Sequence, residues 1–418
     1  MKSPTTPPQL TGSSNDNARV KYDTQEGTSS ERRLTQDRIL DEIRRANDEE
    51  AFFIVDLGQV KRLCRMWEQN LPGILPHYAV KCNPNSRLIE TLASVGINYD
   101  CASESEMNLV LSLGVDPRRI ILANPIKPGS MLRYAKTHGV RRMTFDNADE
   151  LHKVAGVYHD AELYLRITAC DPRSATDLSS KFGCSKASVA PLLALARQLD
   201  LSVTGIAFHV GTGAKDANAY VQAIQDSKEV IEEASRLGFQ IRSLDIGGGF
   251  VQERLPALAP EIRRALEHND YFSSRGIQVL AEPGAFFAAS IATLACNVIG
   301  RRTGENDQGA IDKLYLNDGV YGSFLNVLLE GPELKTYLLK SSSFERRSRQ
   351  GKHAYSLWGP TLDSTDKLCD SYEFDDEVEI GDWLYFEDMG AYTSCTATSF
   401  NGFPPVAKTL YIDSDHEP

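Results

Sequence analysis

The sequence lacks the features that mark membrane, secreted and nucleic-acid-binding proteins. No segment approaches the roughly 20 consecutive apolar residues that a membrane-spanning helix needs. The first residues contain no apolar core and carry acidic side chains, so neither a secretory signal nor a transit peptide is expected. Lys and Arg number 45 against 57 Asp and Glu, and this net charge of −12 argues against nucleic acid as a partner.

Cysteine shows no pattern either. The eight cysteines are scattered, and no two of them form a C-x-x-C pair. A chain of 418 residues can bury a core that needs no disulfide staples. We therefore expect a reducing, cytoplasmic compartment and no metal site.

Composition changes along the chain predict four segments. Residues 1–30 are rich in Pro, Ser, Thr, Asn and Gly and are expected to form a disordered tail. Residues 31–60 combine helical spacing with a short apolar strand and are expected to join a β domain. Residues 61–285 alternate between strand-like and helix-like patterns. Residues 286–418, where Gly, Asp and Asn turns separate short apolar runs, are expected to form a mostly β domain.

The alternating segment predicts a barrel. Strands that alternate with helices pair in parallel through right-handed crossovers. Eight such units favour a closed (β/α)8 barrel over an open sheet, which gives an α/β fold with a second, β-rich domain. The eight predicted strands are residues 76–80, 97–101, 119–123, 142–145, 162–167, 203–209, 241–246 and 277–281.

Ionisable and glycine-rich residues gather at the C-terminal ends of these strands, where a barrel of this kind places its active site. A single Lys, His or glycine turn at a strand end is ordinarily structural. In combination they fit a cofactor that offers an aldehyde, a basic ring nitrogen and a phosphate, as pyridoxal 5'-phosphate (PLP) does. The residues at these ends are Lys81, Asp100, Arg166, His209, Gly247, Gly248, Gly249, Glu282 and Gly284.

Nine motifs in order along most of the folded chain carry a family resemblance. They are HYAVKCN (77–83), DCAS (100–103), ANP (123–125), HVGTG (209–213), DIGGGF (245–250), EPG (282–284), NDGVYGSF (317–324), WGPT (358–361) and MGAYT (389–393). They resemble the ornithine/lysine/arginine/diaminopimelate decarboxylase family of PLP enzymes, and most closely its eukaryotic ornithine decarboxylase branch. The resemblance implies an alanine racemase-like barrel and an α-decarboxylase of an amino acid.

The resemblance also implies the residue roles. Lys81 would bind the cofactor as a Schiff base, Glu282 would pair with the ring nitrogen, and His209 would stack on the ring, which makes these three the catalytic residues. Loss of CO2 would leave a quinonoid carbanion that an acid protonates to give the amine. The implied cofactor-binding set is Lys81, Asp100, Arg166, His209, Thr212, Gly247, Gly248, Gly249, Glu282, Gly284 and Tyr392.

Three positions depart from the family pattern. The family's Cys-Asp becomes Leu362-Asp363, and a Leu has no proton to donate. The family's Tyr-Asp becomes Leu329-Glu330, and its Glu-Pro-Gly-Arg ends in Ala285. With Glu330, Leu362 and Asp363 as substrate-binding residues, the expected substrate is ornithine-like or a modified basic or N-substituted amino acid of specialised metabolism. Decarboxylases of this family act in polyamine biosynthesis, and those of loline-type fungal alkaloid pathways are a precedent for a shifted substrate.

Other interpretations stay open. Leu362 and Ala285 favour a catalytically inactive regulator of the antizyme-inhibitor type, although the retained Lys81 opposes it. A racemase on the same barrel has no motif of its own. Leu362 also allows protonation at a cofactor carbon, which would give an aldehyde. The family implies a homodimer with shared active sites, in which Asp363 acts across the subunit boundary.

Overall fold

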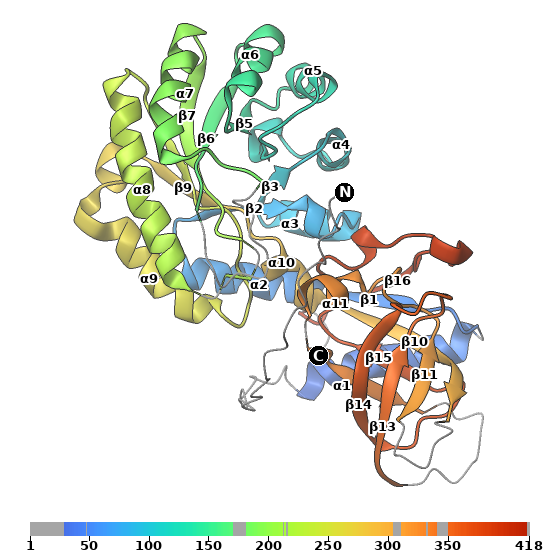
Figure 1. Cartoon of the computed structure of the whole chain (residues 1–418). Helices are drawn as coiled ribbons and strands as arrows, with labels where there is room; N and C mark the ends of the chain where they lie inside the picture. The colour runs from blue at the N-terminus through green and yellow to red at the C-terminus, as the bar shows by residue number, and fades with distance from the viewer. Residues whose placement is uncertain are drawn as a thin grey trace, which may run out of the picture.

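The described chain forms two units. A computed structural model describes residues 29–46, 48–169, 181–211, 213–214, 216–303, 311–331, 333–340 and 350–415. Figure 1 shows a ring of strands and helices, cyan to yellow, and beside it a sheet in orange and red. The expected disordered tail, residues 1–30, lies almost entirely outside the described residues.

The first unit is a closed barrel of eight parallel strands, as predicted. The ring closes where the first and last strands pair through Leu75↔Leu280 and Pro76↔Ala281. Parallel strands that are covered by helices are buried on both faces, which is why they are short continuous apolar runs in the sequence. The strands are β2 (Leu75–Ala79), β3 (Asn98–Cys101), β4 (Ile120–Leu122), β5 (Arg142–Phe145), β6 (Glu162–Arg166), β7 (Ser202–Ala207), β8 (Ser243–Asp245) and β9 (Gln278–Ala281).

Helices cover the outside of the barrel, and capping side chains fix where several of them begin. The Ser103 hydroxyl accepts a hydrogen bond from the Glu106 N–H, and the Glu106 carboxylate accepts one from the Ala102 N–H at 2.7 Å. This arrangement resembles a capping box, except that Glu106 binds the N–H of the residue before the N-cap Ser103. The helices are α2 (Leu57–Asn70), α3 (Ser86–Ser94), α4 (Glu104–Ser112), α5 (Gly129–His138), α6 (Ala148–Val157), α7 (Lys186–Gln198), α8 (Ala217–Arg236) and α9 (Leu255–Glu267).

Apolar side chains fill the inside of the barrel. Ile121, Tyr164, Ala207 and Leu280 form a buried cluster of their own there. Gly205 on β7 leaves room for the Tyr164 ring, because a Cβ at Gly205 would lie 2.4 Å from that ring. The interior is therefore a packed core, and the C-terminal ends of the strands are left as the place for a site.

The second unit is a sheet that takes strands from both sides of the barrel sequence. Its main path runs β12-β15-β10-β11-β13-β14. β1 (Phe52–Asp56) pairs antiparallel with β10 and parallel with β16. The strand that precedes the barrel in the sequence is therefore part of this sheet. The other strands are β10 (Ala292–Arg302), β11 (Asp312–Leu316), β12 (Thr336–Leu339), β13 (Gln350–Trp358), β14 (Lys367–Asp376), β15 (Trp383–Phe386) and β16 (Lys408–Ile412).

One long helix covers the sheet, and one short helix joins the two units. α1 (Ser29–Ala46) packs on the sheet through Ile39, which is buried against Phe52 and its neighbours. α10 (Ala285–Ala288) leads from the barrel into β10, and its Phe286 and Phe287 rings lie 5.4 and 6.0 Å from the Trp67 ring of α2. Within the part of the chain that the structure describes, every helix is too short or too polar to span a bilayer.

Candidate active site at the barrel mouth

Lys81 follows β2 on one turn of 3-10 helix, Val80–Cys82. Its Nζ donates to Oδ2 of the buried Asp100 at 2.5 Å, while the lysine side chain itself is 42% exposed. Desolvation lowers the pKa of Lys81, but the negative charge of Asp100, aided by Tyr392 and Glu282, outweighs it and holds the pKa above its ordinary value. Lys81 is therefore a protonated amine that a ligand can reach, with a buried carboxylate beside it.

Three buried carboxyl groups lie at the ends of β3, β8 and β9. Asp100 is 1% exposed, Asp245 0% and Glu282 9%. Asp100 Oδ1 and Asp245 Oδ2 are buried and accept no hydrogen bond from the described residues. Desolvation, followed by repulsion from the neighbouring acids, raises the pKa of Glu282 well above its ordinary value, and desolvation first of all raises that of Asp245 to about 7. The mouth therefore holds acceptors without donors, which a basic ligand would satisfy.

His209 stands just after β7 as a neutral imidazole. Its Nδ1 accepts a hydrogen bond from the Gly211 N–H at 3.0 Å. Desolvation, followed by the positive charges of Arg166 and Lys81, pushes the pKa of His209 well below its usual range. A Cβ at Gly248 would lie 2.8 Å from Nε2 of this ring, so glycine lets the backbone lie against the imidazole.

The three glycines after β8 form a turn that needs glycine. Gly247 and Gly249 have φ values of +67° and +100°, and a Cβ at these positions would lie 2.3 and 2.6 Å from a backbone carbonyl oxygen. The Gly247 N–H donates to Asp245 Oδ1 at 2.9 Å. The N–H groups of Gly248 and Gly249 meet no acceptor among the described residues. These two amides are the ones available to an anion.

Two further predicted residues lie against the turn that carries Lys81. The Tyr392 N–H donates to the Cys82 carbonyl at 3.0 Å, which brings Tyr392 close enough to act on the pKa of Lys81. A Cβ at Gly284 would lie 3.1 Å from that of Cys82, so glycine permits the close approach of the loop after β9. Segments from opposite ends of the barrel sequence and from the β unit thus meet around one amine.

Two of the predicted substrate residues lie in the β unit, on the loop between β13 and β14. Asp363 Oδ2 accepts from the Tyr321 hydroxyl at 2.7 Å, and Oδ1 accepts from the N–H and hydroxyl of Thr365 at 2.8 and 2.9 Å. The backbone N–H of Leu362 donates to the Asn401 side chain at 2.9 Å, but its own side chain is 92% exposed. The loop is held by polar contacts and presents Leu362 outward.

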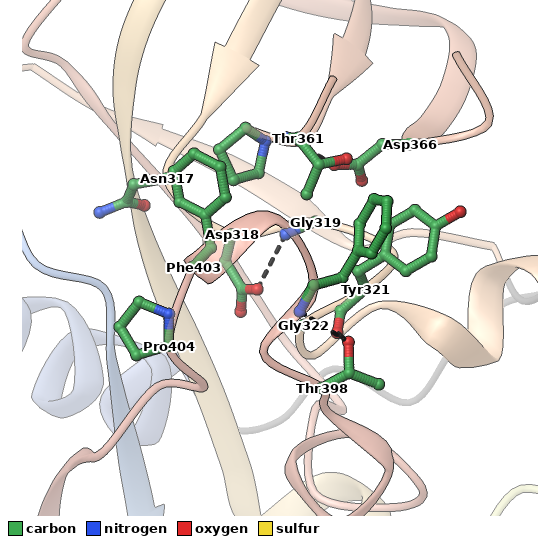
Figure 2. Close-up of a pocket in the computed structure, with 12 residues that line it drawn as sticks. Asn317, Asp318, Gly319, Tyr321, Gly322, Thr361, Asp366, Thr398, Phe403 and Pro404 are labelled. Atoms are coloured by element: carbon green, nitrogen blue, oxygen red, sulfur yellow. Dashed lines mark hydrogen bonds between the residues drawn. The ribbon is translucent and has the colours of Figure 1, made fainter. Parts of the chain in front are cut away.

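One buried aspartate anchors this loop, and a second fixes the neighbouring turn. Asp366 accepts from the Val320 N–H and from the N–H and hydroxyl of Thr361, and Asp318 accepts from backbone N–H groups of its own turn. Figure 2 shows both groups around a cavity of about 20 Å³. That volume holds a water molecule and is too small for an amino acid. The cavity is thus part of the loop's support and not a substrate pocket.

Comparison with known proteins assigns the architecture to one family. Residues 57–289 match the family model described as pyridoxal-dependent decarboxylase, pyridoxal binding domain. The chain belongs to the pyridoxal-dependent decarboxylase family. Ornithine decarboxylase from Neurospora crassa is 43% identical over 397 residues, which cover 88% of this chain and 82% of the relative. Decarboxylase flvG from Aspergillus flavus is 44% identical over 370 residues, covering 88% and 87%.

A solved structure agrees with this assignment. The arginine decarboxylase of Paramecium bursaria Chlorella virus, solved with agmatine bound, is 35% identical, with a TM-score of 0.84 over 91% of this chain and 100% of that one. The chain is therefore a PLP-dependent amino-acid decarboxylase with the alanine racemase-like fold, as the motifs predicted. The antizyme-inhibitor and racemase interpretations fit these matches less well.

The mouth of this decarboxylase fits PLP on its own geometry. Lys81 offers an accessible amine to an aldehyde, and Glu282 is a buried carboxyl group suited to a basic ring nitrogen. Gly248 and Gly249 offer unpaired N–H groups to a phosphate. The chemistry of this donor set therefore matches all three functional groups of the cofactor.

The structure brings most, but not all, of the predicted site residues of this decarboxylase together. Arg166 ends β6, and its charge acts on both His209 and Glu282. Thr212 lies outside the described residues, as does the side chain of Glu330 at the end of α11 (Leu325–Glu330). The predicted set omitted Asp245, although its place before the three glycines, at a strand end, was the signal that could have revealed it.

Proposed function

We propose that this decarboxylase releases the α-carboxylate of an ornithine-like or modified basic amino acid as CO2. The observation that carries the proposal is the Lys81–Asp100 contact at a site where Asp100 Oδ1 and Asp245 Oδ2 accept no hydrogen bond from the described residues. The bound cofactor supplies an electron sink for the pair of electrons that the departing carboxylate leaves behind. A relative named ornithine decarboxylase and a neighbour named arginine decarboxylase support a basic amino acid as substrate.

Each residue of the proposed site has its own role in binding the cofactor. Lys81 would bind the aldehyde, and the buried Asp100 carboxylate holds its Nζ in place. Neutral His209 would lie against the ring face, and Glu282 would pair with the ring nitrogen. The Gly248 and Gly249 amides hold the phosphate, with Tyr392, Thr212 and Arg166 completing the shell and Gly284 permitting its close packing. The Gly247 amide, predicted for the same role, already donates to Asp245 and instead fixes the turn.

The substrate end differs from the family pattern and supports a shifted substrate. Asp363 keeps a carboxylate that Tyr321 and Thr365 orient, and hydrogen bonds from both hold its pKa below the usual range. Leu362 and Leu329, by contrast, present apolar side chains that are 92% and 69% exposed. We propose that Glu330 and Asp363 bind a distal cationic group, and that the leucines accept extra alkyl substituents on it.

We propose the assembly and the compartment from exposed apolar residues and free thiols. Exposed apolar residues on the β unit, led by Leu362, favour a homodimer in which Leu362 and Asp363 reach the partner's site. Every cysteine in the described part of the chain is a free thiol, which supports a reducing, cytoplasmic compartment.

The test is product analysis on the purified, PLP-loaded protein. Ornithine, lysine, arginine and their N-alkylated forms are supplied, and CO2 and the organic product are measured by mass spectrometry. We expect CO2 from at least one substrate, an amine as product, and loss of turnover to the detection limit in Lys81→Ala. The surface variant Lys186→Ala serves as the matched control. A PLP-loaded protein that releases no CO2 from any of them would favour the regulator, and an aldehyde product would place protonation on the cofactor.

A further inference from the structure

Asp245 and Glu282 form a buried carboxyl pair at the ends of neighbouring strands. β8 and β9 are paired in register, and their carboxyl groups lie within hydrogen-bonding reach of each other. The Glu282 N–H also donates to the Gly247 carbonyl at 2.7 Å, which fixes the two loops together. Two carboxyl groups that meet in a dry site cannot both be ionised, because the charges repel and water does not screen them.

The hydrogen bonds of Asp245 indicate where a proton is needed. Its Oδ1 accepts from the Gly247 N–H at 2.9 Å. Its Oδ2 is buried and accepts from no N–H or O–H of the described residues. An ionised carboxylate there would leave a charged oxygen unpaired, which costs several kcal/mol. A proton on Oδ2 removes the charge and turns the same atom into a donor toward Glu282.

The surrounding charges do not replace this proton. Lys81 is already bonded to Asp100, and Asp100 itself raises the pKa of both members of the pair. Arg166 lowers both pKa values but does not restore them to their ordinary range. The groups that act on the pair come from the turn after β2 and from β3 and β6: Lys81, Asp100, Arg166 and the Tyr164 phenol.

We propose that Asp245 is a positioning residue that shares one proton with Glu282. When a basic nitrogen stands against Glu282, the proton stays on Asp245 Oδ2, and this O–H group donates a hydrogen bond to the Glu282 carboxylate. The proposal rests on the proposed function, because it takes Glu282 as the partner of the cofactor's ring nitrogen. Glu282 then remains anionic and fixed in direction, with no second negative charge behind it. A ring nitrogen facing such a carboxylate keeps its proton.

An amide reproduces the protonated acid, so Asp245→Asn tests the protonation state. Its oxygen still accepts from the Gly247 N–H, and its NH2 group donates to Glu282. Asp245→Ala removes both contacts. We expect a PLP dissociation constant within about threefold of wild type for Asp245→Asn and about tenfold or more weaker for Asp245→Ala, the loss expected for one hydrogen bond to a charged group.

The same exchange at Asp366 is the matched control. The Asp366 carboxylate accepts three hydrogen bonds, and an amide cannot accept them all. We expect Asp366→Asn to lower the Tm of the PLP-loaded protein, and Asp245→Asn to leave it within a few degrees of wild type. A large loss of Tm in Asp245→Asn would mean that Asp245 is ionised.

Infrared difference spectroscopy gives a readout that does not depend on activity. The carbonyl band of a protonated carboxyl group should appear in the PLP-loaded wild type, shift in deuterated water and vanish in Asp245→Asn. A missing band, or an Asp245→Asn variant that binds PLP as weakly as Asp245→Ala, would overturn the proposal. A wild type that binds no PLP would overturn the proposed function instead. The same band in the cofactor-free protein would then decide whether the pair holds a proton.

Discussion

At the scale of single residues, the site is organised by unequal burial of opposite charges. Lys81 is 42% exposed, whereas its partner Asp100 is 1% exposed and lies behind it. The amine can therefore meet a ligand from solvent while the carboxylate stays fixed. Because an ionised carboxylate stabilises the ammonium form, Asp100 also sets how much free amine exists at a given pH.

The first prediction concerns the reactivity of that amine. In Asp100→Asn the carboxylate that raises the pKa of Lys81 is gone, and desolvation, which lowers it, remains. A larger fraction of Lys81 is then neutral near pH 8, and a pKa lower by one unit gives about ten times more free amine. Acylation of Lys81 in the cofactor-free protein should therefore be about tenfold or more faster than in the wild type. Peptide-resolved mass spectrometry measures the rate, and the exposed Lys186 in the same digest is the internal control. An unchanged rate at Lys81 would show that Asp100 does not govern its protonation.

The second prediction concerns stability against pH. The pKa of Asp245 is about 7 in the folded protein, mainly through desolvation, against about 4 in an unfolded chain. Between these values the folded state binds the extra proton, so this group's contribution is complete below about pH 4 and is lost as the pH rises through about 7. Asp245→Asn carries no titrating group and should flatten the fall in unfolding free energy over this window. Urea unfolding at several pH values checks it, and parallel curves for the two proteins would contradict it.

At the scale of elements, the sequence predicted the barrel well because each strand is buried on both faces. Its errors lie at the strand ends. The run 203–209 becomes Ser202–Ala207, and 241–246 becomes Ser243–Asp245. At the C-terminal ends, residues 208–209 and 246 leave the ladder where the backbone turns to build the site, and residues 241–242 precede the ladder at the opposite end. Strand-end position, together with the family motifs, predicted roles for Lys81 and Glu282. The Asp245–Glu282 contact was not predictable, because it depends on the register between two strands, which no local pattern encodes.

The third prediction separates clash from backbone strain in the glycine turn. Gly247 and Gly276 have nearly the same φ, +67° and +65°, but a Cβ would meet a carbonyl oxygen at 2.3 Å in Gly247 and open space in Gly276. Gly276→Ala should therefore cost only the left-handed strain, about 1 kcal/mol. Gly247→Ala should cost clearly more and weaken PLP binding as well. Denaturant unfolding and PLP titration measure both, and equal losses in the two variants would contradict the steric argument.

At the scale of the whole molecule, the two units hold separate parts of the proposed site. The amine, the acids and the glycine turn belong to the barrel, whereas Asp363 is oriented by Tyr321 and Thr365 within the β unit. The loop that carries Asp363 is rigidly anchored yet places the neighbouring Leu362 side chain in solvent. A well-held loop with an exposed apolar tip is what an interface between two copies of the chain requires.

The last prediction follows from that division. If Asp363 acts in the partner's site, mixing Lys81→Ala and Asp363→Ala subunits creates heterodimers in which one of the two sites has both residues intact. Random exchange makes half of the dimers mixed, so about a quarter of the wild-type activity should return from two nearly inactive proteins. The control mixes Lys81→Ala with a Lys81→Ala/Asp363→Ala double variant, which can form no intact site. CO2 release after subunit exchange is the measurement, and a mixture no more active than its components would place the whole site within one chain.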